Sequence, residues 1–204
     1  ELGAEVVAVG VRPNGTNINE GVGSLYPDHL GEVVRKEKCH VGLCLDGDAD
    51  RLIVVDERGE TVDGDQLMAI NALAMMAEGK LARQTLVATV MSNLALDRCL
   101  EAAGGHVVRT GVGDRYVVEA MRAGGYNLGG EQSGHLIFLD HSTTGDGLVA
   151  GLGLLGAMVR RGKTVAELAA VLDPLPQTQL ALAVAEKKPL AELPKVQAAI
   201  AAAE

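Results

Sequence analysis

The sequence predicts an α/β protein in which helices pack on a mostly parallel or mixed sheet. Short apolar runs typical of strands alternate with amphipathic runs typical of helices along almost the whole chain. With 204 residues, the chain is long enough for one sizeable core and parts of other domains. It is 48% hydrophobic but has 26 glycines, three Tyr, one Phe and no Trp, so Val, Leu and Ala must build the core.

The expected strands are short apolar runs bounded by turn-forming residues. They fall at residues 4–11, 41–46, 51–59, 85–91, 106–112, 126–131 and 135–140, the third ending in a turn over its last four residues. The expected helices have apolar residues at helical spacing. They fall at residues 26–37, 64–81, 92–105, 114–125 and 145–163. We expect Asp65 and Ser92 to cap the second and third of these helices.

The composition changes after residue 172, where four of the six prolines are found. The segment 174–204 offers one strand and one helix, too little for a core of its own. We expect it to be a linker and the start of another domain. Residues 39–173 would form the central domain, and residues 1–38 the end of an earlier one. Neither chain end resembles a natural terminus, so we expect an incomplete piece.

Charge and hydropathy exclude several classes of protein. The net charge of −9 argues against nucleic-acid binding, which needs a basic patch. The longest apolar run, at 148–159, is shorter than the roughly 18 residues of a membrane span, and no signal peptide is recognisable. The three cysteines lack zinc-site spacing and suit buried reduced thiols, so we expect a cytoplasmic protein.

The most informative stretch is DGDADR, residues 46–51, which we call the aspartate loop. Asp46, Asp48 and Asp50 alternate with small residues after an apolar run, so in an extended segment their carboxylates converge on one side. Three hard anionic oxygens suit Mg²⁺ or Ca²⁺. Arg51 beside them suits either a simple ion pair or a clamp for a phosphate that the metal attracts.

Three other interpretations fit the aspartate loop less well. An EF-hand loop requires Gly at its sixth position, where this chain has Arg51. A haloacid-dehalogenase-type phosphatase would place Thr or Val where Asp50 stands. A solvated acidic turn does not explain three carboxylates directly against apolar strands.

A second group of polar residues lies in GGEQSGH, residues 129–135, which we call the glycine-rich turn. Glu131, Ser133 and His135 offer an acceptor, a hydroxyl and an imidazole to a polyhydroxylated ligand. On composition alone, a plain glycine-rich hairpin explains the turn better than a ligand-binding loop does. In VGDRYV, residues 112–117, Asp114 and Arg115 suit either an anion site at a helix start or a simple N-cap.

Together, DGDADR, VGDRYV, GGEQSGH and TTGDG (143–147), in this order and spacing, resemble the α-D-phosphohexomutase superfamily. PNGTNINEGVGS (13–24), TVMSN (89–93) and VGDRYV are similar to its bacterial branch that acts on glucosamine phosphates. The resemblance implies a three-layer αβα domain 3 with a mixed, mostly parallel sheet, flanked by partial domains 2 and 4.

The resemblance also implies roles for individual residues. Asp46, Asp48 and Asp50 would be Mg²⁺ ligands, and Arg51 would contact phosphate near the metal. Glu131, Ser133 and Arg115 would contact the sugar phosphate. His135 would support the glycine-rich turn. Relatives specific for mannose and glucose phosphates carry His where this chain has Asp114, which favours the glucosamine branch and leaves the role of Asp114 open.

The implied activity is Mg²⁺-dependent interconversion of glucosamine 6-phosphate and glucosamine 1-phosphate, which supplies cell-wall precursors. It runs through a phosphoserine enzyme and a bisphosphate sugar. Neither the phosphoserine loop nor the R-x-S-G-T-E-P loop of the family occurs here, so we expect this chain alone to be inactive. A phosphomannomutase or phosphoglucomutase, or a non-catalytic sugar-phosphate-binding module, remains the alternative. A homodimer of the full-length protein stays open.

Overall fold

The computed structural model describes residues 3–179, 183–184, 186 and 188–203. In chain order its elements are α1 (Pro27–Glu37), β1 (Gly42–Leu45), β2 (Leu52–Val55), β3 (Thr61–Val62), α2 (Gly64–Ala77), η1 (Ala82–Gln84), β4 (Thr85–Thr89), α3 (Ala95–Ala102), β5 (His106–Thr110), α4 (Asp114–Gly124), β6 (Leu128–Gly130), β7 (Leu136–Phe138), α5 (Gly147–Arg161), α6 (Val165–Ala169), η2 (Leu190–Glu192) and α7 (Pro194–Ala203).

The described strands form two sheets. In the four-stranded sheet, with order β5-β4-β6-β7, β4 runs parallel to β5 and β6, and β7 pairs antiparallel with β6. In the three-stranded sheet, with order β1-β2-β3, both pairings are antiparallel. The predicted α/β class with a mixed sheet is therefore confirmed.

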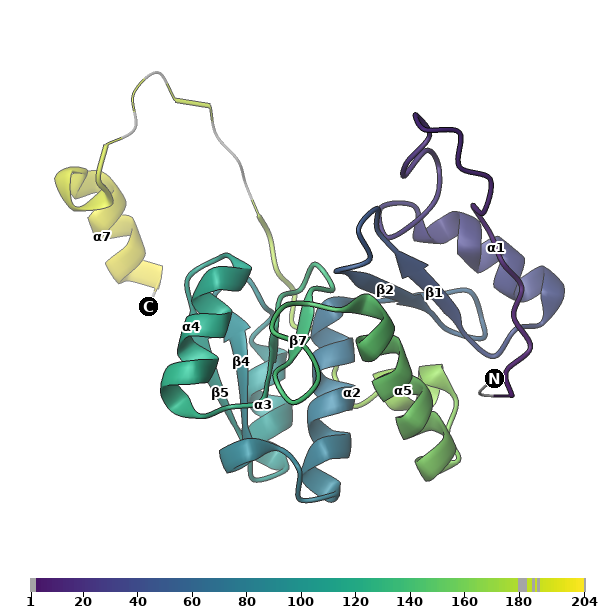
Figure 1. The fold of residues 1–204 in the computed structure, drawn as a ribbon. Coiled ribbons are helices and arrows are strands. Elements are labelled where there is room, and N and C mark those ends of the chain that lie inside the picture. The colour runs from purple at the N-terminus through teal and green to yellow at the C-terminus, as the bar shows by residue number, and fades with distance from the viewer. Residues whose placement is uncertain (1–2, 180–182, 185, 187, 204) are drawn as a thin grey trace.

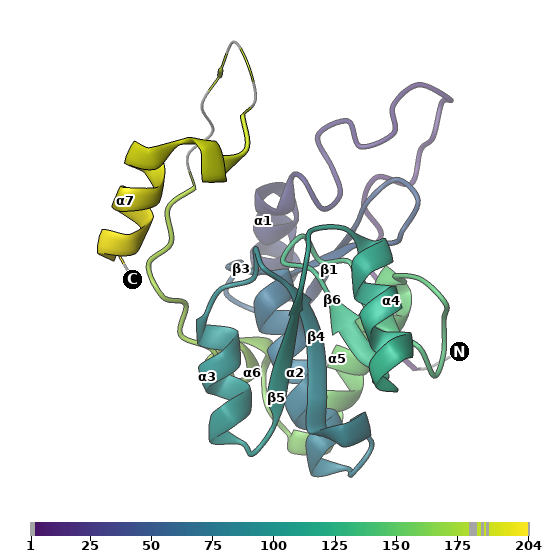
Figure 2. The same ribbon diagram turned by 90° about the vertical axis from the view of Figure 1, so that its left-hand side faces the viewer.

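Strand β4 shows how the layers are built, because its side chains alternate between two faces. Leu86 and Ala88 join the large core with α2, α3, α5 and α6, whereas Val87 packs with Val117 and Met121 of α4. All five residues of β4 are buried, as expected of a strand covered on both faces. The four-stranded sheet is thus the middle of three layers, with α4 on one side and α2, α3 and α5 on the other (Figure 2).

Helix α1 lies beside β1 and β2 and covers one face of the three-stranded sheet (Figure 1). Val34 packs there against Cys44 and Val55. The opposite face of the same sheet, including Leu52 and Val54, joins the large core. The cysteines are free, and burial raises the pKa of the Cys44 thiol to about 11, so Cys44 is a protonated core residue at neutral pH.

The strand expected at residues 4–11 is not present, and residues 3–14 contain no helix or strand. Val6, Val7 and Val11 are exposed, because no neighbouring strand among the described residues pairs with this segment. The strand expected somewhere in residues 174–204 cannot be compared with the structure over residues 180–182, 185 and 187, which lie outside the described residues. The helix expected in the same segment is present as α7. No helix in the described part of the chain has the length and hydropathy of a membrane span.

The predicted caps of two helices are wrong. Helix α2 is capped by Asp63, whose side chain accepts from the backbone N–H of Gln66 (3.0 Å) while the Gln66 side chain accepts from the Asp63 N–H (3.2 Å). Asp65 instead lies inside the first turn, because the extended backbone that a cap requires occurs at Asp63. Helix α3 begins at Ala95, so Ser92 is too early to cap it, and the Asn93 side chain accepts from the Ala95 N–H.

Asp65 is fully buried, and this burial raises the pKa of its carboxyl group, although the N–H of Asn93 donates to Oδ2 at 2.8 Å. Between the ordinary carboxyl pKa of about 4 and the raised pKa of Asp65, the folded state binds more protons than the unfolded state. Asp65 therefore lowers the stability of the fold as the pH rises through this range. We expect the free energy of unfolding of Asp65→Asn, minus that of the parent, to increase from pH 4 to pH 7. Urea unfolding at each pH measures this difference, and a constant difference would contradict the prediction.

Candidate functional site

The aspartate loop follows β1 directly, and the structure brings its three carboxylates together. One ligand oxygen from each of Asp46, Asp48 and Asp50 lies within 4.8 Å of the others. They converge because the chain turns over residues 47–49, not because an extended segment alternates its faces. The Ala49 N–H donates to the Asp46 carbonyl at 3.2 Å, and Ala49 adopts a φ of +61°.

The charges in this loop are not balanced by the protein alone. Burial is the largest cause of the raised pKa of Asp50, and its hydrogen bond with Asp46 and the charges of Asp46 and Asp48 act in the same direction. Arg51 Nε lies 3.8 Å from oxygens of both Asp46 and Asp50, too far for hydrogen bonds, with its side chain 46% exposed. Carboxylate oxygens with this spacing fit a hard divalent cation after small side-chain rotations.

His135 connects the glycine-rich turn to the aspartate loop. The Gly145 N–H donates to His135 Nε2 at 3.2 Å, so the imidazole proton lies on Nδ1. Nδ1 lies 3.1 Å from Asp50 Oδ2 and donates to it. With 3% of its surface exposed and both ring nitrogens engaged, His135 is buried behind the loop and orients Asp50.

The glycine-rich turn joins β6 to β7 and presents Glu131 and Ser133 beside the start of α4. Glu131 Oε1 accepts from the N–H of Gly113 at 3.0 Å, and Ser133 Oγ is 3.4 Å from Glu131 Oε2. Ser133 is exposed and Glu131 is half-buried. These two side chains can therefore reach a ligand at the surface while Glu131 stays anchored by a backbone amide.

Close backbone contact holds the turn and the aspartate loop in one register. The N–H of Leu52, at the end of the aspartate loop, donates to the Gly134 carbonyl at 3.0 Å. Gly134 has a φ of +90°, and a Cβ there would overlap the Leu52 carbonyl oxygen. No other residue type has both the backbone freedom and the small size that this position requires.

Arg115 and Asp114 lie on the first turn of α4. The Arg115 side chain is 81% exposed and donates to Glu119, one turn further along the helix, at 2.8 Å. Asp114 accepts from the Arg115 N–H at 2.7 Å, whereas the N-cap residue is Gly113. Arg115 is close to the glycine-rich turn because Gly113, two residues earlier, donates to Glu131 of that turn. Its guanidinium, however, pairs with Glu119.

Three helices begin at this site, which the motifs alone did not predict. The first amide of α2, Gly64 N–H, donates to the Gln132 carbonyl at 3.1 Å, and the first amide of α5, Gly147 N–H, donates to the Ala49 carbonyl at 2.9 Å. Helix α4 starts beside Glu131. The positive ends of three helix dipoles thus surround the loops, which favours anionic ligands. This arrangement could have been predicted from the rule that ligands bind at the carboxyl edge of a parallel sheet.

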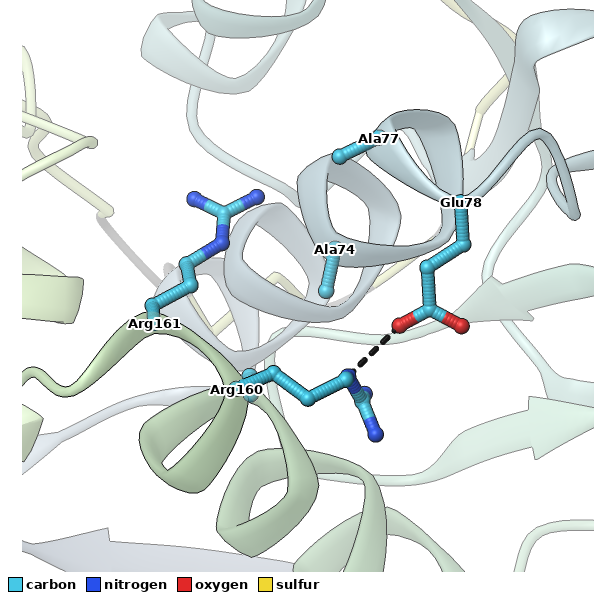
Figure 3. Close-up of a pocket in the computed structure, with 6 residues that line it drawn as sticks. Ala74, Ala77, Glu78, Arg160 and Arg161 are labelled. Atoms are coloured by element: carbon cyan, nitrogen blue, oxygen red, sulfur yellow. Dashed lines mark ion pairs between the residues drawn. The ribbon is translucent and has the colours of Figure 1, made fainter.

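The hollow in Figure 3 belongs to another part of the molecule. It is lined by the last residues of α2 and α5, including Ala74, Ala77 and Glu78, and Arg160 Nε pairs with Glu78 Oε1 at 2.6 Å. Both helices begin at the candidate site. The 14 residues of α2 therefore put the hollow roughly 20 Å away from the site.

The fold and site define a three-layer α/β/α unit with an acidic loop and a glycine-rich turn at the carboxyl edge of its sheet. The chain belongs to the phosphoglucomutase/phosphomannomutase family, because residues 63–175 match the family's alpha/beta/alpha domain III. The aspartate loop precedes this matched segment, but it lies within the 204 residues that align with a curated relative.

The chain is 59% identical over 204 residues to the phosphoglucosamine mutase of Syntrophotalea carbinolica, covering 100% of this chain and 45% of that protein. The phosphoglucosamine mutase of Geotalea uraniireducens is 58% identical over 196 residues, covering 96% of this chain and 43% of that protein. A phosphoglucomutase/phosphomannomutase family structure from Burkholderia thailandensis matches with a TM-score of 0.65 at 28% identity, covering 74% of this chain and 33% of that one. The predicted resemblance is confirmed, and the chain spans less than half the length of these relatives.

Proposed function

We propose that the chain supplies the metal-binding and sugar-binding loops of a Mg²⁺-dependent mutase that interconverts glucosamine 6-phosphate and glucosamine 1-phosphate. The observation that carries this proposal is the direct connection between the two loops, through the His135–Asp50 pair and the Leu52–Gly134 hydrogen bond. The connection joins a cluster suited to a hard cation to a turn suited to a polyhydroxylated ligand. The similarity to phosphoglucosamine mutases supports glucosamine phosphates as the substrate class.

In this proposal, Asp46, Asp48 and Asp50 hold the Mg²⁺ ion, which when bound neutralises phosphate charge next to the sugar. His135 fixes the direction of the Asp50 carboxylate and does not touch the sugar. Arg51 is only loosely paired, so its guanidinium is free to turn toward a phosphate oxygen.

The glycine-rich turn would bind the sugar itself. Glu131 accepts from sugar hydroxyl groups with Oε2 while Gly113 holds Oε1, and Ser133 donates or accepts beside it. Arg115 would contact a phosphate group of the ligand after releasing Glu119, with which it now pairs. The positive ends of α2, α4 and α5 add to the attraction for a doubly charged phosphate group.

The same family resemblance supports our remaining proposals about the whole protein. Residues 39–173 would be domain 3, residues 1–38 the end of domain 2 and residues 174–204 a linker and the start of domain 4. The reaction would use a phosphoserine and a bisphosphate sugar, in a cytoplasmic phosphoprotein that feeds amino-sugar and cell-wall metabolism. A homodimer is open to test by sedimentation.

Calorimetry with this chain and Mg²⁺ tests the substrate class. We expect glucosamine 6-phosphate to bind more tightly than glucose 6-phosphate or mannose 6-phosphate, and Glu131→Gln to weaken its binding by about tenfold because a charged acceptor is lost. Glu32→Gln, an exposed glutamate on α1, is the matched control and should change nothing. Preference for glucose or mannose phosphate would favour the alternative mutases, and unchanged binding in Glu131→Gln would refute the sugar role of the turn.

A turnover assay of the same chain tests the catalytic part separately. Because no serine here is assigned as the phosphoryl carrier, we expect binding without sustained interconversion of the two glucosamine phosphates. Continued turnover by this chain alone would contradict that expectation, whichever sugar binds best.

A further inference from the structure

The exit segment, residues 175–177, is where the chain leaves the α/β/α unit, and the Asn93 side chain makes most of the hydrogen bonds that hold it. Asn93 Oδ1 accepts from the Leu175 N–H at 3.0 Å, and Asn93 Nδ2 donates to the Leu175 carbonyl at 2.8 Å and to Gln177 Oε1 at 3.3 Å. Gln177 Nε2 in turn donates to the Met91 carbonyl at 3.3 Å. Asn93 is 7% exposed and lies in the connection between β4 and α3, so this anchor is part of the folded interior.

Asn93 is itself held rigidly. Its backbone N–H donates to Asp65 Oδ2 at 2.8 Å, and its carbonyl accepts from Arg109 Nη2 at 3.1 Å. Arg109 also donates to the carbonyls of Thr89 and Ser92, both at 2.7 Å, and pairs with Asp97. The connection from β4 to α3 is therefore fixed by the Arg109 guanidinium and the Asp65 carboxylate.

Asp65 connects this anchor to the candidate site through the start of α2. Its neighbour Gly64 donates to the Gln132 carbonyl at 3.1 Å. A Cβ at Gly64 would lie 2.5 Å from the carbonyl oxygens of Gln132 and Glu131, so the helix start and the glycine-rich turn are in direct backbone contact. A displacement of the helix start must therefore move the turn, because the interior is close-packed.

The polar cluster around Asp65 contains buried polar atoms that lack hydrogen-bond partners. Among the described residues, Asp65 Oδ1, Ser92 Oγ and Arg109 Nε are buried side-chain atoms without a hydrogen-bond partner. A buried polar atom without a partner is unfavourable, because it has lost its hydrogen bonds to water. The hydrogen bonds that the cluster does make therefore hold it in one arrangement, and losing one of them affects its neighbours.

We propose that Asn93 and Asp65 couple the exit segment to the glycine-rich turn, so that the direction of the chain after residue 177 and the geometry of the site change together. Asn93 acts at the exit segment, Asp65 at the start of α2, and their hydrogen bond joins the two. Both are positioning residues, and neither touches a ligand. The coupling holds whichever ligand the site takes, so it stands apart from the proposed function.

Amide hydrogen exchange of the whole 204-residue chain, resolved by residue, tests the coupling, with the Val87 amide in the core reporting global stability. We expect Asp65→Ala to raise the exchange rate of the Leu175 amide by about tenfold relative to Val87, although Asp65 makes no hydrogen bond with Leu175. We expect Asn93→Ala to raise the exchange rate of the Gly64 amide in the same way.

Asn127→Ala is the matched control. Asn127 also bridges two segments, accepting from the Ala82 N–H at 2.9 Å and donating to the Lys80 carbonyl at 2.9 Å. This variant should raise exchange at Ala82 and leave Leu175 and Gly64 unchanged. If Asp65→Ala, Asn93→Ala and Asn127→Ala raised the exchange rate of the Leu175 amide equally, the proposal would be overturned. Equal increases would reflect a general loss of stability and not a specific coupling.

Gln177→Ala keeps the test decisive if the buried variants do not fold, because Gln177 is exposed. It removes the hydrogen bonds to Asn93 and Met91, so a smaller increase in exchange, about threefold, is expected at both Leu175 and Gly64. An increase confined to Leu175, or no increase at either amide, would show that the anchor is local and that the coupling does not exist.

Discussion

Asp48→Asn is expected to weaken Mg²⁺ binding by at least about tenfold, or 1.4 kcal/mol, because it removes one of three clustered anionic ligands. Asp48 is exposed, so the substitution should leave the fold intact. Without metal, the variant should be at least as stable as the parent, because one source of charge repulsion is gone. Calorimetric titration with Mg²⁺ measures the affinity, and thermal unfolding with and without Mg²⁺ measures the stabilisation that binding provides.

Asp173→Asn is the matched control, because it removes the same charge from another exposed aspartate outside the cluster. Its Mg²⁺ affinity should equal that of the parent, which separates loss of a ligand from a general change in net charge. If Asp48→Asn bound Mg²⁺ as tightly as Asp173→Asn, the aspartate loop would not be the metal site.

Gly134→Ala is expected to cost at least about 3 kcal/mol of folding stability or to abolish folding. The new Cβ would overlap the Leu52 carbonyl oxygen, which is backbone and cannot rotate away, and Ala is strained at a φ of +90°. Because this contact sets the register of the two loops, any folded fraction should also bind Mg²⁺ more weakly. Urea unfolding followed by circular dichroism measures the free energy.

Gly104→Ala provides the comparison, since Gly104 has a φ of +81° but open space where its Cβ would stand. It should cost about 1–2 kcal/mol from backbone strain alone. The excess cost at Gly134 is then the cost of the steric overlap, and equal costs for the two variants would show that the overlap relaxes freely.

Much of the fold was predictable because its signals are local. The long apolar segments of α2 and α5, with their helix-forming residues, and the short apolar run of β4 predict the type of each element, and the structure has those elements close to the expected positions. The three aspartates of the loop are close in sequence, so their clustering was also predictable, although the turn that brings them together was not.

Predictions that depended on a partner far away in sequence were the ones that needed correction. Residues 4–11 have strand composition but no strand beside them in the described residues. Asp65 has the composition of a helix cap, yet Asp63 has the required backbone and Asp65 is buried against Asn93, 28 residues away. Composition shows that a carboxylate is present but does not show which amide it meets.

The α/β class, the order of most elements, the acidic loop and the glycine-rich turn could all be predicted from the chain, because each depends on the spacing of residues along it. Three contacts could not be predicted in this way: His135 with Asp50, Gly113 with Glu131, and Asn93 with Leu175. These contacts join residues 18 to 85 positions apart. Their geometry arises when the helices and strands pack, since packing determines which donors and acceptors are left to pair.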